Sequence, residues 1–277
     1  QDLAESLEQF HATSAATALA TRLAAKIKTA TPALSMLSVR GMMVHSAKWT
    51  PEMIRIGNIK DIIPLCGYGV PDEETALFSN EKYATFIFEN ELIPYWEKDG
   101  SNTYNQLHFY DLPWPTEVLE QMGEENVKIR ITLSYYVKPS PGYAGRSNKY
   151  RYPSATLHFD LKSASESMEE FLCRRNKSEG EKKTDNDTNR WTIKQQRREQ
   201  GTVQSDWIEC TAAELASCGQ IIVYPGQGWW KERKLANVDN VIKYSLIVSI
   251  ETTKTEIYDA VETAISNRIG VQIMQEV

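Results

Sequence analysis

The sequence His11-Ala12-Thr13-Ser14-Ala15-Ala16-Thr17-Ala18 is the starting point for the fold expected of the N-terminal part of the chain. It begins a run of small residues, with leucine and isoleucine at helical spacing, that continues to Ala30. A helix with small or apolar residues on nearly every face is typically buried, so we expect residues 14–30 to form a buried helix. Thr13 and Ser14 suit its N-cap, because their side-chain oxygens can accept hydrogen bonds from free backbone N–H groups.

Ser14 also admits a chemical interpretation. A serine at a helix N-terminus lies beside backbone N–H groups that have no partner within the helix, and beside the positive end of the helix dipole. Such groups can stabilise the oxyanion of an acyl-transfer intermediate. Because N-cap serines far outnumber catalytic serines, the stretch alone favours the structural role, and the remaining sequence has to decide.

The same stretch resembles the nucleophile motif of the subtilisin-like serine peptidases (subtilases), which reads Gly-Thr-Ser-x-Ala and is often followed by x-Pro. Here Ala12 stands in place of the glycine and Ala18 in place of the proline. Two further segments resemble the family in the same order: residues 34–47 are similar to the helix that follows the nucleophile, and residues 66–77 to the turn and helix that close the catalytic domain. The three matches lie in about the first quarter of the chain.

The resemblance implies that Ser14 is the nucleophile of a serine endopeptidase that hydrolyses polypeptide substrates, and that its backbone N–H donates to the oxyanion. This chemistry needs no metal and no organic cofactor, and no EF-hand-like acidic loop indicates calcium. The family's aspartate, histidine and oxyanion asparagine all precede the serine, but only thirteen residues precede Ser14 here, and Asp2 and His11 match neither motif. We therefore expect the C-terminal part of a longer peptidase, inactive on its own because a triad needs a base and an acid.

Other residues in this region are expected to be structural. Ala12 would be strained if the backbone there had a positive φ, which the family's glycine tolerates. His45 is expected to pack at a helix end rather than act as a base, and Gly67-Tyr68-Gly69 to form a turn rather than a phosphate site. Asp72 is expected near the N-terminus of a short helix that follows this turn.

Composition excludes several classes of partner and site. The net charge of −6 and the pI of about 5.4 argue against nucleic acid or an anionic membrane, because both require a basic surface. The four cysteines include no CxxC pair, so a zinc site is not indicated, and reduced thiols in a cytoplasmic protein are expected. A disulfide between Cys210 and Cys218 is possible but not indicated.

From about residue 82 the pattern changes to alternating, β-rich segments. Without βαβ alternation, such a set predicts an antiparallel sandwich. Residues 127–135 alternate strictly, so we expect this strand to have one solvent-exposed face. The expected strands are 83–88, 106–110, 127–135, 155–161, 221–224 and 244–250.

The fold class expected is therefore mixed α and β. Residues 1–81 are expected to be the helical C-terminal remnant of an α/β subtilisin-like catalytic domain, and residues 82–277 an antiparallel β-sandwich. The strands at 127–135 and 155–161 loosely resemble the jelly-roll module that follows the catalytic domain in many subtilases. The resemblance also extends to a bacterial subgroup of subtilases that is often paired with an AAA-type ATPase, which is the partner expected here.

Two features of the sandwich region admit alternatives. Residues 165–205 are expected to be a charged insert, mobile over Arg174–Thr188, followed by a basic patch of Arg190, Lys194, Arg197 and Arg198 around Trp191. A nucleic-acid contact is the weaker interpretation of this patch, and a solvated helix face with one buried aromatic is the stronger. Trp229-Trp230 could form a carbohydrate platform or a partner patch, but an aromatic plug with one ring in and one partly out is favoured.

Three functions remain open on the sequence. The first is a subtilisin-type endopeptidase that acts through Ser14. The second is a non-enzymatic binding module in which the β-sandwich carries the function, and the third is an inactive pseudo-peptidase in which Ala12 has abolished activity.

Overall fold

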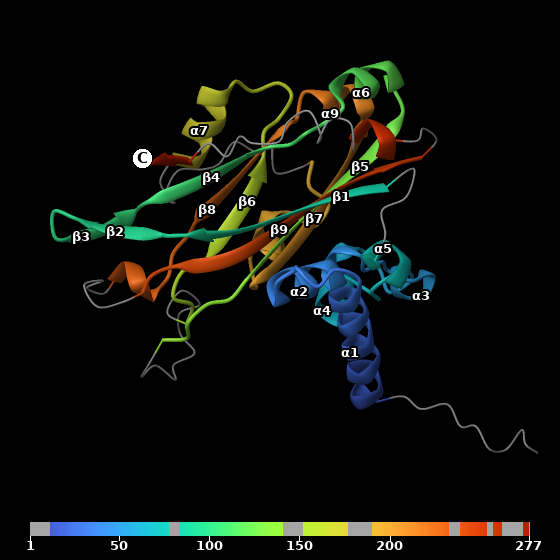
Figure 1. The fold of residues 1–277 in the computed structure, drawn as a ribbon, viewed down its shortest axis with the longest axis horizontal. Coiled ribbons are helices and arrows are strands. Elements are labelled where there is room, and N and C mark those ends of the chain that lie inside the picture. The colour runs from blue at the N-terminus through green and yellow to red at the C-terminus, as the bar shows by residue number, and fades with distance from the viewer. Residues whose placement is uncertain are drawn as a thin grey trace, which may run out of the picture. The chain divides into compact units, whose positions relative to one another are not determined.

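The computed structural model describes residues 12–77, 83–140, 152–176, 190–232, 239–253, 257–261 and 274–276. The chain divides into two compact units, Gln1–Phe78 and Ser79–Val277. The first unit is helical and the second is built mainly from antiparallel strands (Figure 1). The mixed α and β fold class expected from the sequence is thus confirmed at this level.

The first unit is a set of helices whose starts are marked by capping residues. The Ser35 side chain accepts from the Ser38 N–H at the start of the second helix, and Asn58 and Asp61 form a capping box at the fourth. The helices are α1 (Thr13–Ala30), α2 (Met36–His45), α3 (Pro51–Ile54), α4 (Ile59–Cys66) and α5 (Glu73–Leu77).

Helix α1 is largely exposed, so the expectation of a buried helix is wrong. Of its residues only Leu23 and Ile27 are buried, and Leu19 has 64% of its surface exposed. Leu23 and Ile27 lie in the C-terminal half of the helix, and α1 packs with α2 and α5. The described part of this unit contains helices and one β-bridge but no sheet. Small residues permit burial of every face, but the N-terminal half of α1 stays exposed, and none of its residues from Thr13 to Arg22 is buried.

The turn at Gly67–Gly69 is structural, as predicted. Lys48 and Val70 form an antiparallel bridge, and Gly69 has a φ of +101°. A Cβ at Gly69 would lie 2.2 Å from the Lys48 carbonyl oxygen, so a side chain cannot be accommodated. Asp72 then caps α5 by accepting from the Thr75 N–H at 2.8 Å, and this bond holds the pKa of Asp72 below its ordinary value.

The described residues of the second unit form two four-stranded antiparallel sheets and a separate hairpin. All six strands predicted from the sequence are present, with small changes at their ends. The first sheet has the order β1 (Tyr83–Leu92), β9 (Ile242–Thr252), β5 (Asn126–Tyr135), β7 (Val203–Thr211). The second has the order β10 (Met274–Glu276), β4 (Gln106–Asp111), β8 (Gln220–Pro225), β6 (Leu157–Leu161), and the hairpin is β2 (Tyr95–Lys98) and β3 (Ser101–Tyr104).

Short helices connect these strands. In Figure 1, α6 and α9 lie side by side at one end of the unit, and the β2–β3 hairpin extends from the other end. The helices are α6 (Thr116–Met122), α7 (Met168–Asn176), α8 (Gln195–Arg198), α9 (Ala212–Ala216) and the 3₁₀ helix η2 (Trp229–Glu232). No helix in the described part of the chain has the length and apolar character needed to cross a bilayer.

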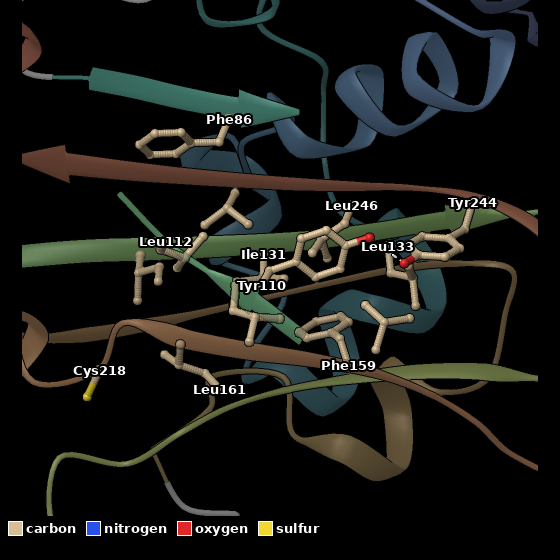
Figure 2. Close-up of a cluster of buried hydrophobic side chains, with 14 of the residues drawn as sticks. Phe86, Tyr110, Leu112, Ile131, Leu133, Phe159, Leu161, Cys218, Tyr244 and Leu246 are labelled. Atoms are coloured by element: carbon tan, nitrogen blue, oxygen red, sulfur yellow. Dashed lines mark hydrogen bonds between the residues drawn. The ribbon is translucent and has the colours of Figure 1, made fainter. Parts of the chain in front are cut away.

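Side chains from both sheets form one hydrophobic core (Figure 2). Ile131 and Leu133 of β5 and Leu246 of β9 come from the first sheet, and Phe159 and Leu161 of β6 come from the second. All five side chains have 1% or less of their surface exposed. The two sheets are therefore layers around a shared interior.

The sequence missed strand β7 and the β2–β3 hairpin. The hairpin turn is Asp99-Gly100, with φ values of 52° and 77°, as a two-residue turn of the primed type requires. In β7 the polar residues Gln204, Ser205 and Asp206 are buried, so the strand does not show the usual apolar alternation.

Strand β5 does not have the exposed face that its alternation predicted. Thr132 and Ser134, on the polar face, have none of their surface exposed, and Arg130 only 7%. The Thr132 hydroxyl donates to Ser205 Oγ at 2.8 Å, and Arg130 Nε donates to the same oxygen at 3.0 Å. The polar side chains of this face hydrogen-bond to one another, so alternation reports which residues share a face but not whether water reaches it.

The residue range predicted for the charged insert, 165–205, is too wide. Trp191 and Ile193 are buried, and Val203 already belongs to β7. The buried aromatic is confirmed at Trp191, but Arg198, expected on a solvated face, is only 2% exposed. Residues 177–189, which include most of the segment predicted to be mobile, lie outside the described residues.

Both tryptophans of the Trp229-Trp230 pair are buried. Trp229 is 9% exposed and Trp230 1%, so the expectation that one ring lies partly out is wrong. The Trp229 indole donates to the Lys138 carbonyl oxygen at 3.0 Å. Rings that are packed in this way offer no carbohydrate platform or partner patch.

Candidate active site

Ser14 lies in the first turn of α1 but does not cap it. The N-cap is Ala12, whose side chain makes no capping bond, and Thr13 and Ser14 follow as the first two helical residues. The predicted capping role is therefore wrong by one or two positions, since the helix begins earlier than the sequence suggested. Ala12 has φ −153° and ψ 153°, a region open to every residue, so the positive φ that would have strained its methyl group is not present.

The Ser14 side chain is exposed. Its hydroxyl forms no hydrogen bond with another described residue. Thr17 and Thr21, on the same helix, instead donate to the carbonyl oxygens four residues earlier. Ser14 contributes one of the first-turn N–H groups, which have no partner inside an α-helix. The amide donors and the positive end of the dipole can stabilise a developing oxyanion. The Ser14 hydroxyl can act as the nucleophile, provided that a base removes its proton.

No base is hydrogen-bonded to Ser14 in the part of the chain that the structure describes. His45 is buried at the end of α2, with 1% of its surface exposed, as predicted for a packed histidine. Asp72 is occupied as the cap of α5. Asp2 and His11 lie outside the described residues.

Metal and thiol chemistry find no support in the described residues. These residues contain no group of three or more histidine, cysteine, aspartate or glutamate side chains that could hold a metal ion. Cys66, Cys210 and Cys218 are free thiols. Burial raises the pKa of Cys210 to about 12 and also raises that of Cys218, so both stay protonated and are poor nucleophiles.

A buried ionic cluster around Arg198 was not predicted from the sequence. The guanidinium packs against the rings of both Phe159 and Trp191, with its centre 4.3 Å and 4.7 Å from the two ring centres. Its NH1 is 3.6 Å from Asp206 Oδ2. Burial raises the pKa of Asp206, and the Arg198 charge opposes that rise. Asp206 also accepts from three backbone N–H groups, those of Ile193, Lys194 and Trp207.

The same region closes the edge of the second sheet. Strand β6 is the last in its sheet, and three of its carbonyl oxygens accept from side chains instead of from another strand. Gln204 Nε2 donates to Leu157 at 2.8 Å, and Arg198 NH2 donates to Phe159 at 3.2 Å. Arg190 NH2 donates to Leu161. Side chains thus occupy the position of a neighbouring strand.

A second buried polar group joins the two sheets. His108 Nδ1 of β4 is 2.6 Å from the Tyr244 hydroxyl of β9, which also hydrogen-bonds to the Tyr110 hydroxyl. Figure 2 shows the rings of Tyr110 and Tyr244 within the core. Burial lowers the pKa of His108 and raises those of both tyrosines, so all three groups are held neutral.

Acid is expected to destabilise the second unit through His108. Because its folded pKa is lowered from the ordinary value of 6.5, the unfolded chain binds the proton more readily, and stability falls as the pH drops below about 6.5. Urea denaturation followed between about pH 8 and pH 5 measures the loss. His108→Gln should flatten this part of the profile; an unchanged profile in that variant would assign the acid sensitivity to other groups.

Comparison with known proteins adds one match. Residues 1–84, less than half of the 277-residue chain, match the model of the subtilase family (Peptidase_S8). No curated protein and no solved structure matches the chain. At the level of the family, the segment that contains Ser14 and helices α1 to α5 is similar to the subtilases, a family of serine peptidases.

Proposed function

We propose that this chain is the C-terminal part of a subtilisin-like serine endopeptidase in which Ser14 is the nucleophile. The observation that carries the proposal is the state of Ser14 inside the family-matched segment: its hydroxyl is exposed, is not used as a helix cap, and lies in the first turn of α1. An N-cap role would have explained the serine without catalysis, and that role is absent. The aspartate and histidine of the triad would lie on polypeptide that precedes this sequence.

The proposed reaction follows from this placement. The Ser14 oxygen attacks the carbonyl carbon of the scissile peptide bond, and a histidine on the preceding polypeptide takes its proton. The Ser14 N–H, at the positive end of the α1 dipole, donates to the oxyanion that forms. The histidine then protonates the leaving amine, and water hydrolyses the acyl-enzyme. No metal or organic cofactor takes part in these steps.

The uncovered faces of α1 support the part of the proposal that concerns missing sequence. Leu19 is 64% exposed, and most of the alanines between Ala12 and Ala25 are exposed or only half-buried. A helix that is small or apolar on nearly every face normally lies inside a domain. Preceding polypeptide that covers α1 would restore this environment and supply the missing base.

For the second unit we propose the jelly-roll fold. In a jelly roll the first strand pairs with the last, and the second with the last but one. With the β2–β3 hairpin and β10 set aside, β1 pairs with β9 and β4 with β8 in the described residues. An AAA-type ATPase partner stays a prediction from the resemblance, and a cytoplasmic location stays a prediction from the cysteine content.

A fluorophosphonate probe tests the proposal. The natural full-length protein is expected to react with the probe, and Ser14→Ala is expected to lose the labelling because the acylated oxygen is gone. Ser101→Ala, which removes an exposed hydroxyl from β3, is the matched control and should label normally. The 277-residue chain alone should show no proteolysis.

Two results would contradict the proposal. Labelling that persists in Ser14→Ala would remove Ser14 from the mechanism, and proteolysis by the 277-residue chain alone would contradict the missing triad. A full-length protein that fails to label, but gains labelling in Ala12→Gly, would instead identify a pseudo-peptidase. The unstrained backbone of Ala12 argues against that alternative.

A further inference from the structure

The outer strands of the two sheets differ in how their free edges are covered. Side chains cover three carbonyl oxygens of β6, and β10 has only three residues. Along β7 the Thr192 N–H donates to the Trp207 carbonyl oxygen at 3.1 Å, and the Asp206 carboxylate accepts from the Ile193 and Lys194 amides. The fourth outer strand of the described sheets is β1, which has ten residues.

The hydrogen-bond pattern of the first sheet determines which groups of β1 point outward. The Tyr135 N–H donates to the carbonyl oxygen of Thr202, next to β7, so odd-numbered residues of β5 bond toward β7 and even-numbered ones toward β9. Even-numbered residues of β5 lie opposite odd-numbered residues of β9, and even-numbered residues of β9 lie opposite even-numbered residues of β1. The even-numbered residues of β1 therefore bond to β9, and Thr85 and Ile87 point their N–H and C=O groups away from the sheet.

These outward groups of Thr85 and Ile87 form no hydrogen bond within the part of the chain that the structure describes. Both residues are half-buried rather than enclosed. Further along the strand the edge is already occupied, since the Glu91 N–H donates to Asn90 Oδ1 at 2.8 Å. Unpaired N–H and C=O groups on an outer strand are a template for another strand. The segment around Thr85 and Ile87 can therefore extend the sheet.

The charges along β1 favour an antiparallel partner of the same sequence. The first six residues of the strand are uncharged, and its acids, Glu89 and Glu91, follow. Two copies related by a two-fold axis pair antiparallel, so each acidic end lies beside the uncharged start of the other strand. With Thr85 opposite Ile87 of the second copy, Glu89 lies opposite Tyr83, and Glu91 lies beyond the start of the other strand. Like charges, which destabilise a directly opposed pair, do not meet within β1.

We propose that β1 pairs with β1 of a second copy and joins the first sheets of both copies into one continuous sheet. The Thr85 N–H donates to the Ile87 carbonyl oxygen of the second copy and the Ile87 N–H of that copy donates to the Thr85 carbonyl oxygen, and the two-fold axis repeats both bonds. Both side chains are β-branched, which suits paired strands. Because this pairing uses β1 of each copy, and β6 and β7 are covered, assembly stops at the dimer. The role of Ser14 does not enter this inference.

The concentration dependence of the intact chain tests the pairing. Analytical ultracentrifugation should show the mass rising from 31.5 kDa to twice that value, without larger species, as the concentration is raised to about 1 mM. Exchange of the Thr85 and Ile87 amides should slow as the dimer forms, whereas that of the Ile131 and Leu133 amides, inside the sheet, should not change. A monomer at the highest concentration would overturn the proposal. Thr85 and Ile87 amides that are already protected in the monomer would overturn it too, because another segment of the same chain would then fill the edge.

Thr85→Pro is the decisive variant. Proline removes the outward N–H but leaves the bonds to β9, because that N–H points away from β9. The dissociation constant of the dimer should rise about tenfold or more. Leu19→Glu, which alters the exposed part of α1, is the control and should dimerise like the unaltered chain. An unchanged dimer in Thr85→Pro, or its loss in Leu19→Glu, would overturn the pairing through β1. Should Thr85→Pro fail to fold, the exchange experiment on the unaltered chain decides alone.

Discussion

Arg198→Met is expected to lower the free energy of unfolding of the second unit by about 3–5 kcal/mol. Removing one member of a buried ion pair leaves its partner as an uncompensated charge, which here is Asp206, with none of its surface exposed. The Phe159 carbonyl also loses its donor. Methionine fills much of the space that the arginine side chain occupies against the two aromatic rings, so the cost is electrostatic rather than a cavity.

Urea denaturation followed by tryptophan fluorescence measures this effect, because six of the seven tryptophans lie in residues 79–277. The matched control is Arg197→Met. Arg197 is the neighbouring arginine on α8 and is not buried, so its replacement should change stability by no more than about 0.5 kcal/mol. If the two variants are equally stable, the Arg198 cluster does not stabilise the unit.

Gly228→Ala is expected to cost about 3 kcal/mol, at the upper end of the range for overpacking. A Cβ at this position would lie 2.3 Å from the Ser154 carbonyl oxygen and 2.4 Å from the Ala155 Cα. Both are backbone atoms that cannot rotate away. The adjacent Trp229 and Trp230 amides donate to the carbonyls of Pro153 and Ser154, so separating the two segments also breaks these bonds.

Gly201→Ala is the control for this substitution. A Cβ at Gly201 would have its nearest neighbour 3.8 Å away, at the Val203 carbonyl oxygen. Thermal unfolding followed by near-ultraviolet circular dichroism reports on the packing of the aromatic side chains, among them Trp229 and Trp230. Equal melting temperatures for the two variants would show that the loop at Gly228 moves without cost.

The strands of the second unit could be predicted because alternation is a local property of the sequence. Val127–Tyr135 and Tyr244–Ile250 carry apolar residues on one face, and both are strands in the core. The exposure of the other face could not be predicted, because it depends on what packs there. Thr132 is polar yet has none of its surface exposed, while Leu19 of α1 is apolar and 64% exposed.

The motif around Ser14 identified the candidate site from the sequence alone. That the Ser14 side chain is exposed could be seen only in the structure. The buried cluster at Arg198 could not be found through a motif of this kind. Arg198 and Asp206 are eight positions apart on different elements, and charged residues in a sequence are most simply assigned to solvent. The Phe159 carbonyl oxygen, to which Arg198 donates, belongs to β6, which lies about 40 residues earlier in the chain.

The side chains along β6 have a consequence for how the molecule behaves at high concentration. A terminal strand with vacant carbonyls is a template on which another polypeptide can extend the sheet, which is a common route to fibrils. Here Gln204, Arg198 and Arg190 already occupy the carbonyls of Leu157, Phe159 and Leu161. A second molecule would have to displace two arginines and a glutamine before it could pair, so this margin of the sheet protects the protein against its own aggregation.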